Sequence, residues 1–328
     1  MSARLRPVAG FVVLAAVLVV LPAFISDFRA QQLAYVAIYL CALLGLNVLT
    51  GYTGQISLGH GAFMAIGGYT TAILMSDHGV KDVVTIPIAA LVAGAMGFLF
   101  GIPALRLSGL YLALATFATA VATPAVIKKF DGFTGGGPGL NLFGKPELTA
   151  SLKPVSILGL ELNFNNWLYA LCWMVALALY VVAWLLLRGR LGRAFRAVRD
   201  SETAAQSFGV SLARTKTLAF AISAAYAGVA GSLFAIATTY VNPDTFPIQL
   251  SIFLLVGVVV AGLGSLKGLI AGAIFIEFLP QWAQEVSKSP GAPGVVYGLV
   301  LIATMFLLPV GVSGLLDRLG ALVRRSRS

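Results

Sequence analysis

Long apolar segments follow one another along almost the whole chain, and they constrain its fold more than any other feature. Of the 328 residues, 59% are hydrophobic and only 10% are charged, whereas soluble domains carry about 25% charged residues. A helix that spans the hydrocarbon core of a bilayer needs roughly 20 apolar residues, and a lipid-exposed backbone must satisfy its own hydrogen bonds. The sequence therefore predicts an all-α polytopic membrane protein with a single transmembrane domain over residues 1–328.

Ten segments have the length and composition of a transmembrane helix. They are residues 8–26, 31–50, 60–77, 84–105, 109–128, 165–187, 216–238, 248–263, 268–284 and 294–313. Arg4 and Arg6 before the first segment are also compatible with a signal peptide. Because no small-x-small cleavage site follows, we expect an uncleaved first helix, and cleavage would leave the remaining topology unchanged.

The distribution of lysine and arginine predicts the orientation. Seven of the 22 basic residues lie in 188–216, and an even number of spans places this loop on the same side as both termini. Fifteen basic residues then lie on that side and seven on the other, and the positive-inside rule assigns the richer side to the cytoplasm. We therefore expect cytoplasmic termini, a cytoplasmic loop at 188–216 and a periplasmic loop at 129–164. The net charge of +10 follows from this asymmetry and does not indicate binding to nucleic acid.

The loop at 188–216 has the pattern of two short helices. After a basic first helix, Asp200 and Ser201 offer an N-cap for a second helix at 202–208, and Glu202 falls in its first turn. Gly209 suits the left-handed position just past the end of that helix. We expect this helix to dock on a soluble partner, and an ordinary solvated loop helix is the alternative. The expected docking residues are Arg199, Asp200, Glu202, Ala204, Ala205 and Gly209.

Two glycine-rich junctions interrupt the apolar segments, at 51–63 (GYTGQISLGHGAF) and at 262–273 (GLGSLKGLIAGA). Non-helical backbone at membrane depth is tolerated only where it is buried in protein or lines a water-filled path. The first junction is therefore either a broken helix beside such a path or a plain turn with close-packed glycines. The spacing of Gly268 and Gly272 is typical of tight helix packing. Each junction precedes an outgoing helix, which suggests a parallel internal repeat, with chance similarity as the alternative.

Uncharged polar side chains near the first junction are candidates for lining a translocation pathway, because they offer donors and acceptors to an amphoteric solute without a fixed charge. Glu277 is the clearest intramembrane carboxylate, and it either faces the pathway or is hydrogen-bonded to a neighbouring helix. The expected pathway residues are Asn47, Gln55, Ser57, His60, Tyr111, Thr116 and Glu277.

The sequence contains no recognisable catalytic or metal-binding pattern. No Cys/His/Asp cluster has metal-ligand spacing, and Cys41 and Cys172 have the surroundings of small buried hydrophobes. The TGGGPGL segment at 134–140 lacks the preceding strand and the Gly-Lys-Ser/Thr ending of a phosphate-binding loop. We expect no enzymatic activity, no metal and no cofactor in this chain, so energy for transport would come from ATP on another subunit or from an ion gradient.

At the 188–216 loop the chain resembles the membrane-spanning permeases of ABC importers, whose hallmark is Glu-Ala-Ala, three residues and Gly. Glu202, Ala204, Ala205 and Gly209 look like that element, although Thr203 intrudes after the glutamate. The resemblance is closest to the branched-chain amino acid permease group of the LivM type and extends over about residues 31–317. It rests on 51–63, on RLSGLYLALATFA at 106–118, on 134–140, on 262–273 and on YGLVLIATMFLLPVGVSGLL at 297–316.

The resemblance implies a subunit of a larger machine in the bacterial inner membrane. Its partners would be a second, LivH-like permease, two cytoplasmic ATPase subunits that bind ATP, a periplasmic substrate-binding protein and membrane lipid. The solute would be a branched-chain amino acid or a related small amphoteric molecule, with urea, short amides or aromatic acids as the alternative. A secondary transporter driven by an ion gradient is the alternative of another class, which broken helices and Glu277 would fit.

Overall fold

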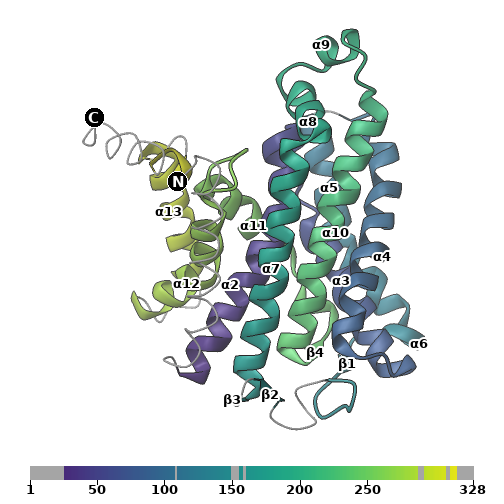
Figure 1. Ribbon diagram of the computed structural model, residues 1–328, viewed down its shortest axis with the longest axis vertical. Coiled ribbons are helices and arrows are strands. Elements are labelled where there is room, and N and C mark those ends of the chain that lie inside the picture. Colours follow the sequence, from purple (N-terminus) through teal and green to yellow (C-terminus); the bar gives the residue numbers. More distant parts are fainter. Residues whose placement is uncertain are drawn as a thin grey trace.

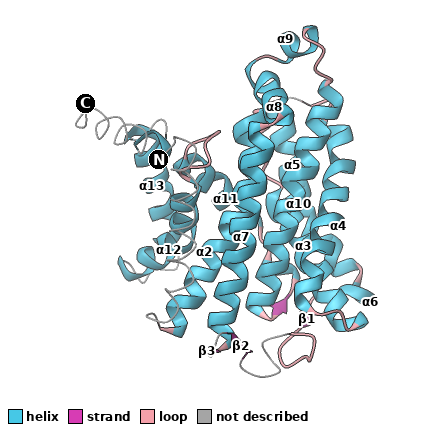
Figure 2. Ribbon diagram, in the orientation of Figure 1, coloured by secondary structure: helices cyan, strands magenta, loops and turns pink. Residues whose placement is uncertain are grey.

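The computed structural model describes residues 26–107, 109–148, 155–157, 160–286, 292–307 and 311–315. Within this part of the chain, long helices run side by side between the two ends of a bundle (Figures 1 and 2). One end carries α8 (Arg190–Asp200) and α9 (Glu202–Ser207) and is called the α9 end. The other carries α6 (Asp131–Thr134) and is called the α6 end. The predicted first span at 8–26 lies outside the described residues.

Each of the other predicted spans coincides with a helix that starts within four residues of the predicted position. These helices are α2 (Asp27–Leu46), α3 (His60–His78), α4 (Asp82–Ala104), α5 (Leu110–Lys129), α7 (Phe164–Arg188), α10 (Leu212–Thr238), α11 (Ile248–Ala261), α12 (Leu269–Val286) and α13 (Ala292–Leu307). Among the described residues, six stretches are long and apolar enough to cross a membrane, and they contain α2, α4, α5, α7, α10 and α11. The chain is thus an all-α, multi-pass membrane protein, while the number of crossings and the side of the termini stay predictions.

Helices α2 and α10 form the centre of the bundle and are mostly buried, whereas only about a quarter of α4, α5 and α7 is fully buried. Small residues let α10 approach its neighbours closely, as in membrane helix pairs generally. A Cβ atom on Gly231 would lie 1.9 Å from the carbonyl oxygen of Met64 on α3, and one on Gly228 would lie 2.5 Å from Cβ of Ala93 on α4. These contacts leave no space for a side chain, so the two glycines fix how tightly α10 packs between α3 and α4.

The predicted Gly268–Gly272 pair packs helix against helix, as its spacing indicated. A Cβ atom on Gly268 would lie 1.9 Å from the carbonyl oxygen of Ala261, and one on Gly272 would lie 2.4 Å from that of Gly257. Both carbonyls belong to α11, so the pair holds α12 directly against the preceding helix.

Short elements cover the α6 end. Strand β1 (Leu140–Asn141) pairs antiparallel with β4 (Tyr240–Val241), and β2 (Val155–Ile157) pairs with β3 (Leu160–Leu162). The first pair joins the predicted 129–164 loop to the connection between α10 and α11. Glycine permits this approach, since a Cβ atom on Gly139 (φ 75°) would lie 2.2 Å from the carbonyl oxygen of Val241. The glycines of TGGGPGL therefore serve a backbone contact in this fold.

The chain is interrupted between α2 and α3. A π-helical turn, η2 (Asn47–Tyr52), continues α2 as far as Thr53, and residues 54–59 then run without helical structure to His60. The His60 imidazole Nε2 lies 2.9 Å from the carbonyl oxygen of Ala42. Ala42 is ten residues before Tyr52, so at 1.5 Å per residue His60 lies roughly 15 Å back along α2. Residues 53–59, called the re-entering segment below, therefore return into the bundle, which decides for the broken helix and against the plain turn.

A second interruption precedes α11. Residues 239–247 contain only β4 and the 3₁₀ turn η4 (Pro243–Thr245) before α11 begins. The backbone N–H of Gly61 donates to Ser251 Oγ at 2.9 Å, so the first turns of α3 and α11 lie next to each other. At 14 residues, α11 is roughly 21 Å long and shorter than the roughly 30 Å hydrocarbon core. Two helices thus start inside the bundle, with their N-terminal turns in contact.

The packing of α10 leads to a first prediction. We expect Gly231→Ala to lower the free energy of unfolding by roughly 1–3 kcal/mol, because the new methyl group would overlap the Met64 carbonyl. The matched control is Gly132→Ala in α6, where a Cβ atom meets nothing within 4 Å. Thermal unfolding of the purified protein in detergent would compare the two. Equal midpoints for both variants would contradict the close α3–α10 contact.

Candidate functional site

Helix α9 is capped at both ends. The Ser201 side chain accepts a hydrogen bond from the backbone N–H of Ala204 at 3.2 Å, which makes Ser201 the N-cap. At the other end Gly209 adopts the left-handed conformation (φ 83°), and the N–H of Val210 donates to the carbonyl of Ala205 at 3.0 Å. This arrangement satisfies the terminal carbonyls of the helix. The predicted short, capped helix is confirmed, with its last helical residue at Ser207.

The outer surface of α9 differs from what the sequence indicated. Ala204 is exposed, but Ala205 is buried against the bundle, so only the first of the two alanines is open to a partner. Phe208 follows the helix and is 89% exposed, and sequence reasoning had left it out. No signal in the sequence indicated its exposure, because Ala204, Ala205 and Leu212 stand at helical spacing from Phe208 and could have covered it. In Figure 1, α9 projects beyond the ends of the long helices.

Two polar contacts attach α8 and α9, called the coupling segment below, to the bundle. Glu202 Oε1 lies 2.7 Å from Nζ of Lys216 on α10, whose side chain is only 7% exposed. Arg199 Nη1 donates to the carbonyl of Gly51 at 3.1 Å, and its Nε lies 3.2 Å from the Asp200 carboxylate. The coupling segment is therefore held to α10 on one side and to the end of η2 on the other.

Asn47 connects the two glycine-rich junctions. Its amide Nδ2 donates to the carbonyl of Ser265 at 3.0 Å, and its Oδ1 accepts from the N–H of Gly264 at 2.9 Å. A Cβ atom on Gly264 would lie 2.9 Å from Arg199 Nη1. The end of α2, the 262–273 junction and the coupling segment therefore meet at one place.

Side chains of the re-entering segment alternate between buried and exposed, as they do in an extended chain. Gln55 and Ser57 are buried, whereas Gly54 and Ile56 between them are exposed. Its backbone groups find partners outside a helix, since the N–H of Leu58 donates to Thr116 Oγ1 of α5 at 2.9 Å. The Thr50 hydroxyl donates to the carbonyl of Gln55 at 3.1 Å. One edge of the segment faces the bundle, and the other is open to whatever lies beside this chain.

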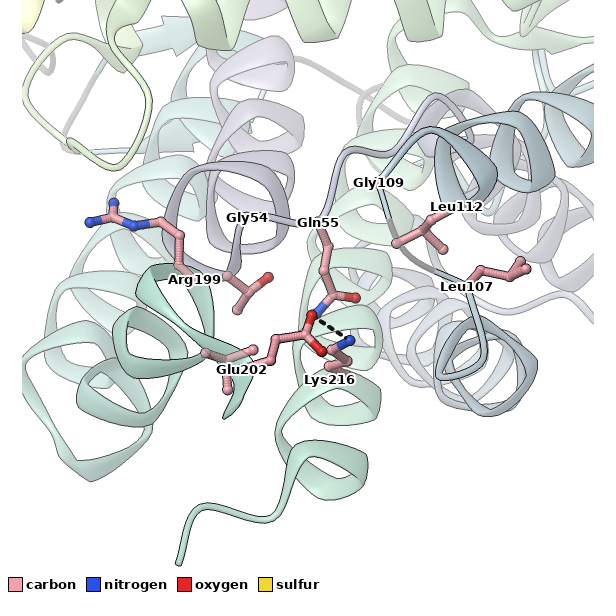
Figure 3. Close-up of a pocket in the computed structure, with 10 residues that line it drawn as sticks. Gly54, Gln55, Leu107, Gly109, Leu112, Arg199, Glu202 and Lys216 are labelled. Atoms are coloured by element: carbon pink, nitrogen blue, oxygen red, sulfur yellow. Dashed lines mark ion pairs between the residues drawn. The ribbon is translucent and has the colours of Figure 1, made fainter. Parts of the chain in front are cut away.

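A cavity of about 130 Å³ lies between the re-entering segment and the coupling segment. Figure 3 shows the Gln55 side chain reaching toward the Glu202–Lys216 ion pair, with Leu107 of the α4–α5 connection and Leu112 of α5 to one side. Gln55 is 6% exposed, and neither its Nε2 nor its Oε1 has a hydrogen-bond partner in the structure. The cavity therefore combines a carboxylate, an ammonium group and an unpaired amide. Its apolar lining includes Leu107, Leu112 and Val198.

The structure brings most of the predicted pathway residues together. Asn47, Gln55, Ser57, His60 and Thr116 all lie in or beside the re-entering segment. Each of them is buried within the single chain.

Tyr111 and Glu277 lie apart from that group. Tyr111 is exposed on the outer face of α5. The Glu277 carboxylate accepts from Gln281 Nε2 at 3.0 Å, and Gln281 accepts from Gln32 of α2 at 2.6 Å. The Glu277 carboxylate is therefore bonded within α12 and is connected to the neighbouring helix α2 only through Gln281.

Among the described residues, no group of three or more His, Cys, Asp or Glu side chains could hold a metal ion. Cys41 and Cys172 are buried and free of disulfide bonds.

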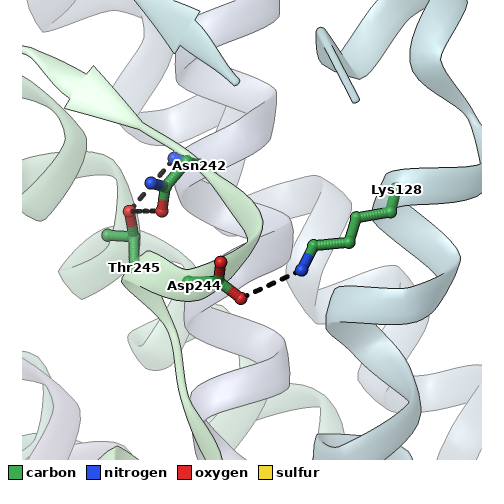
Figure 4. Close-up of polar contacts among 4 residues, drawn as sticks. All are labelled: Lys128, Asn242, Asp244 and Thr245. Atoms are coloured by element: carbon green, nitrogen blue, oxygen red, sulfur yellow. Dashed lines mark hydrogen bonds and ion pairs between the residues drawn. The ribbon is translucent and has the colours of Figure 1, made fainter. Parts of the chain in front are cut away.

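The α6 end presents a different surface. The Lys128 ammonium lies 3.2 Å from the Asp244 carboxylate (Figure 4), and both side chains are largely exposed. Beside them, Asn242 and Thr245 exchange the paired hydrogen bonds of a capping box, which fixes η4. Several large aromatic side chains of this end are exposed, namely Phe130, Phe133, Phe143 and Tyr240. The rings of Phe130 and Phe133 lie 5.9 Å apart, and neighbouring exposed apolar side chains of this kind are typical of an interaction surface.

Comparison with known proteins finds a family match and relatives that are all described as transport permeases. Residues 29–307 match the family described as branched-chain amino acid transport system / permease component. The high-affinity branched-chain amino acid transport system permease protein LivM of Escherichia coli strain K12 is 39% identical over 255 residues, which are 73% of this chain and 60% of that protein. A probable branched-chain amino acid transport permease protein LivH of Methanocaldococcus jannaschii is 24% identical over 282 residues, 83% of this chain and 87% of that protein. The chain spans about three fifths of the length of its LivM relative. No solved structure matches this chain.

The ion pair at the cavity leads to a second prediction. Glu202→Gln leaves Lys216 buried without its counter-charge, so we expect it to destabilise the protein more than the double variant Glu202→Gln/Lys216→Met does. A double-mutant cycle in detergent should give a coupling free energy of about 1 kcal/mol. The control is the exposed pair Lys128–Asp244, whose coupling should be smaller, roughly 0–0.5 kcal/mol. Equal coupling free energies for the two pairs would argue against a stabilising ion pair between Glu202 of α9 and the buried Lys216 of α10.

Proposed function

Because the chain belongs to the permease family of branched-chain amino acid transport systems, we propose that it is the membrane-spanning permease subunit of an ABC importer. The solute is a branched-chain amino acid or a related small amphoteric molecule. The subunit lies in the bacterial inner membrane, catalyses no reaction itself and relies on ATP bound by separate cytoplasmic subunits. The single observation that carries this proposal is α9, a projecting helix with both ends capped that is tied to the interrupted helices of the bundle.

In this proposal α9 docks on an ATPase subunit. Phe208 and Ala204 supply an exposed apolar contact, and Arg199 and Asp200 supply exposed charge beside it. A movement of the ATPase would shift α9. The bonds of Arg199 to Gly51 and of Glu202 to Lys216 would then pass that shift to η2 and α10. Such a switch needs two packings of rigid elements and no covalent step in this chain.

The translocation pathway would form between this chain and a second, LivH-like permease. The exposed edge of the re-entering segment, at Gly54 and Ile56, and the open face of α5, which includes Tyr111, are the surfaces available for it. Ser57 and Thr116 lie directly behind that edge and could offer hydroxyl groups if the segment shifts. A discontinuous helix next to a path is a recurrent arrangement in transporters.

A periplasmic substrate-binding protein would dock at the α6 end. The exposed aromatic side chains there include Phe143, which is 79% exposed, and the same end carries the exposed Lys128–Asp244 pair. Aromatic side chains are enriched where protein interfaces gain most of their binding free energy.

The proposal is tested in proteoliposomes that contain this chain, the second permease and the ATPase subunits. We expect uptake of radiolabelled L-leucine to require ATP in the lumen of the proteoliposomes, where the ATPase subunits face, and binding protein added outside. The control preparation omits the ATPase subunits and receives a proton or sodium gradient instead. Uptake in that control would contradict an ABC importer and support a secondary transporter.

The two proposed docking surfaces predict opposite effects for two phenylalanines. Phe208→Ala should weaken co-purification of the ATPase subunits roughly tenfold, because a buried phenylalanine contributes about 1.5–3 kcal/mol, and should leave the affinity for the binding protein unchanged. Phe143→Ala should do the reverse. Each variant is the control for the other, and both side chains are exposed, so the fold tolerates the change. Loss of both partners in either variant would contradict the assignment of the two ends.

A further inference from the structure

The cavity between the re-entering segment and the coupling segment contains a buried amide without partners. Gln55 is 6% exposed, and both its Nε2 donor and its Oε1 acceptor lack hydrogen bonds. An unpaired buried polar group costs roughly 1–3 kcal/mol, and buried amides in folded proteins are almost always paired. Because this amide reaches into a cavity, a molecule that enters from outside can pair with it, provided that the molecule offers both an acceptor and a donor.

The charges around Gln55 narrow the kind of molecule. Lys216 and Glu202 form one ion pair at the wall of the cavity, with a separation of 2.7 Å. Arg199 also lines the cavity, but its guanidinium points away from it and bonds to the carbonyl of Gly51 and the carboxylate of Asp200 (Figure 3). An occupant with a net charge would favour one of the two groups and face repulsion from the other. A zwitterion can place its carboxylate toward Lys216 and the Gln55 amide nitrogen, and its ammonium group toward Glu202 and the Gln55 oxygen. No net charge then enters the cavity.

Apart from Thr53, Arg199 and two glycines, the remaining wall is apolar. Leu107 comes from the α4–α5 connection, Leu112 from the first turn of α5 and Val198 from α8. The volume of about 130 Å³ has room for several water molecules or one small solute. An aliphatic side chain against these three residues would leave the polar end of the same molecule beside Gln55.

We propose that this cavity is a binding site for a small α-amino acid with an aliphatic side chain, and that its occupancy holds the coupling segment to the re-entering segment. The inference rests on the proposed function for the identity of the solute class and for the cytoplasmic location of the α9 end. The occupant contacts Gln55 of the re-entering segment and Glu202 of α9 at once, so it stabilises the arrangement in which these two are adjacent. Solute that accumulates inside the cell would thereby oppose the movement of α9 and slow ATP turnover.

The test measures equilibrium binding of radiolabelled L-leucine to the assembled permeases and ATPases in lipid nanodiscs without binding protein. We expect saturable binding that unlabelled leucine displaces. Isocaproate, which lacks the ammonium group, and isoamylamine, which lacks the carboxylate, should each compete at least tenfold more weakly. Absence of saturable binding, which means that water alone fills the cavity, would overturn the proposal, as would equal competition by either half-ligand.

Two substitutions locate the binding at Gln55. Gln55→Leu should weaken leucine binding at least tenfold, while the matched control Gln32→Leu, in the hydrogen-bonded chain toward Glu277, should not. Gln55→Glu is nearly isosteric and adds a second carboxylate beside Glu202, so this variant should bind isoamylamine more tightly than leucine, a gain that misfolding cannot produce. Unchanged leucine binding in Gln55→Leu, or no change of preference in Gln55→Glu, would refute the site.

ATPase activity in the same nanodiscs tests whether the bound amino acid slows ATP turnover. Together with the uptake assay, it also separates the proposed cavity site from the proposed importer. Leucine should lower the ATPase activity of the nanodiscs in the absence of binding protein, and Gln55→Leu should reduce that inhibition at least tenfold in apparent affinity. ATP-driven uptake in proteoliposomes together with no leucine binding in nanodiscs rejects the cavity site and leaves the importer intact. Failure of ATP-driven uptake rejects the importer itself.

Discussion

Inside a membrane-embedded bundle, a helix can stop only where other groups accept and donate the hydrogen bonds that it gives up. Residues 53–59 meet this requirement with side chains from several helices. Thr53 donates to the carbonyl of Leu49, Thr116 accepts from the N–H of Leu58, and the His60 ring contacts the carbonyl of Ala42. The interruption between α2 and α3 therefore persists because hydroxyl and imidazole groups stand where helical bonds would have been, and the rest of the architecture follows from it.

The side-chain hydrogen bonds that replace helical ones at this interruption also connect it to distant elements of the chain. Asn47 fixes the end of α2 to the 262–273 junction, and Arg199 fixes the carbonyl of Gly51 to the coupling segment. Each is a hydrogen bond between elements far apart in sequence, so a displacement of α9 cannot leave the re-entering segment unaffected. Bonds of this kind can be exchanged for others at modest cost, whereas the glycine contacts of α10 with α3 and α4 are limited by steric overlap. The α9 end is thus connected by hydrogen bonds that can re-form with other partners, whereas the core around α10 is held by close packing.

Sequence patterns predicted the features that depend on local chemistry. Apolar length located the helices, and Ser201 with Gly209 marked the ends of α9, because capping involves only a few neighbouring residues. The return of 53–59 into the bundle was one of two alternatives that the sequence left open, and the contact between the first turns of α3 and α11 could not be predicted. They depend on partners such as Ser251, which lies 190 residues from Gly61. Exposure of Phe208 was equally hidden, since a phenylalanine in a loop can pack inward or project.

The inserted threonine in the coupling element shows how a departure from a pattern can be accommodated. Successive residues of a helix are about 100° apart, so the insertion of Thr203 turns the glutamate away from the position it has when it directly precedes the two alanines. Here Glu202 is the first residue after the N-cap, and from there its carboxylate reaches Lys216 on α10. Lys216 is almost fully buried and needs a counter-charge at that point. The position of Glu202 and the burial of Lys216 therefore explain each other: the shifted acid makes the buried lysine tolerable, and the lysine ties α9 to the bundle in place of a contact made through the usual spacing.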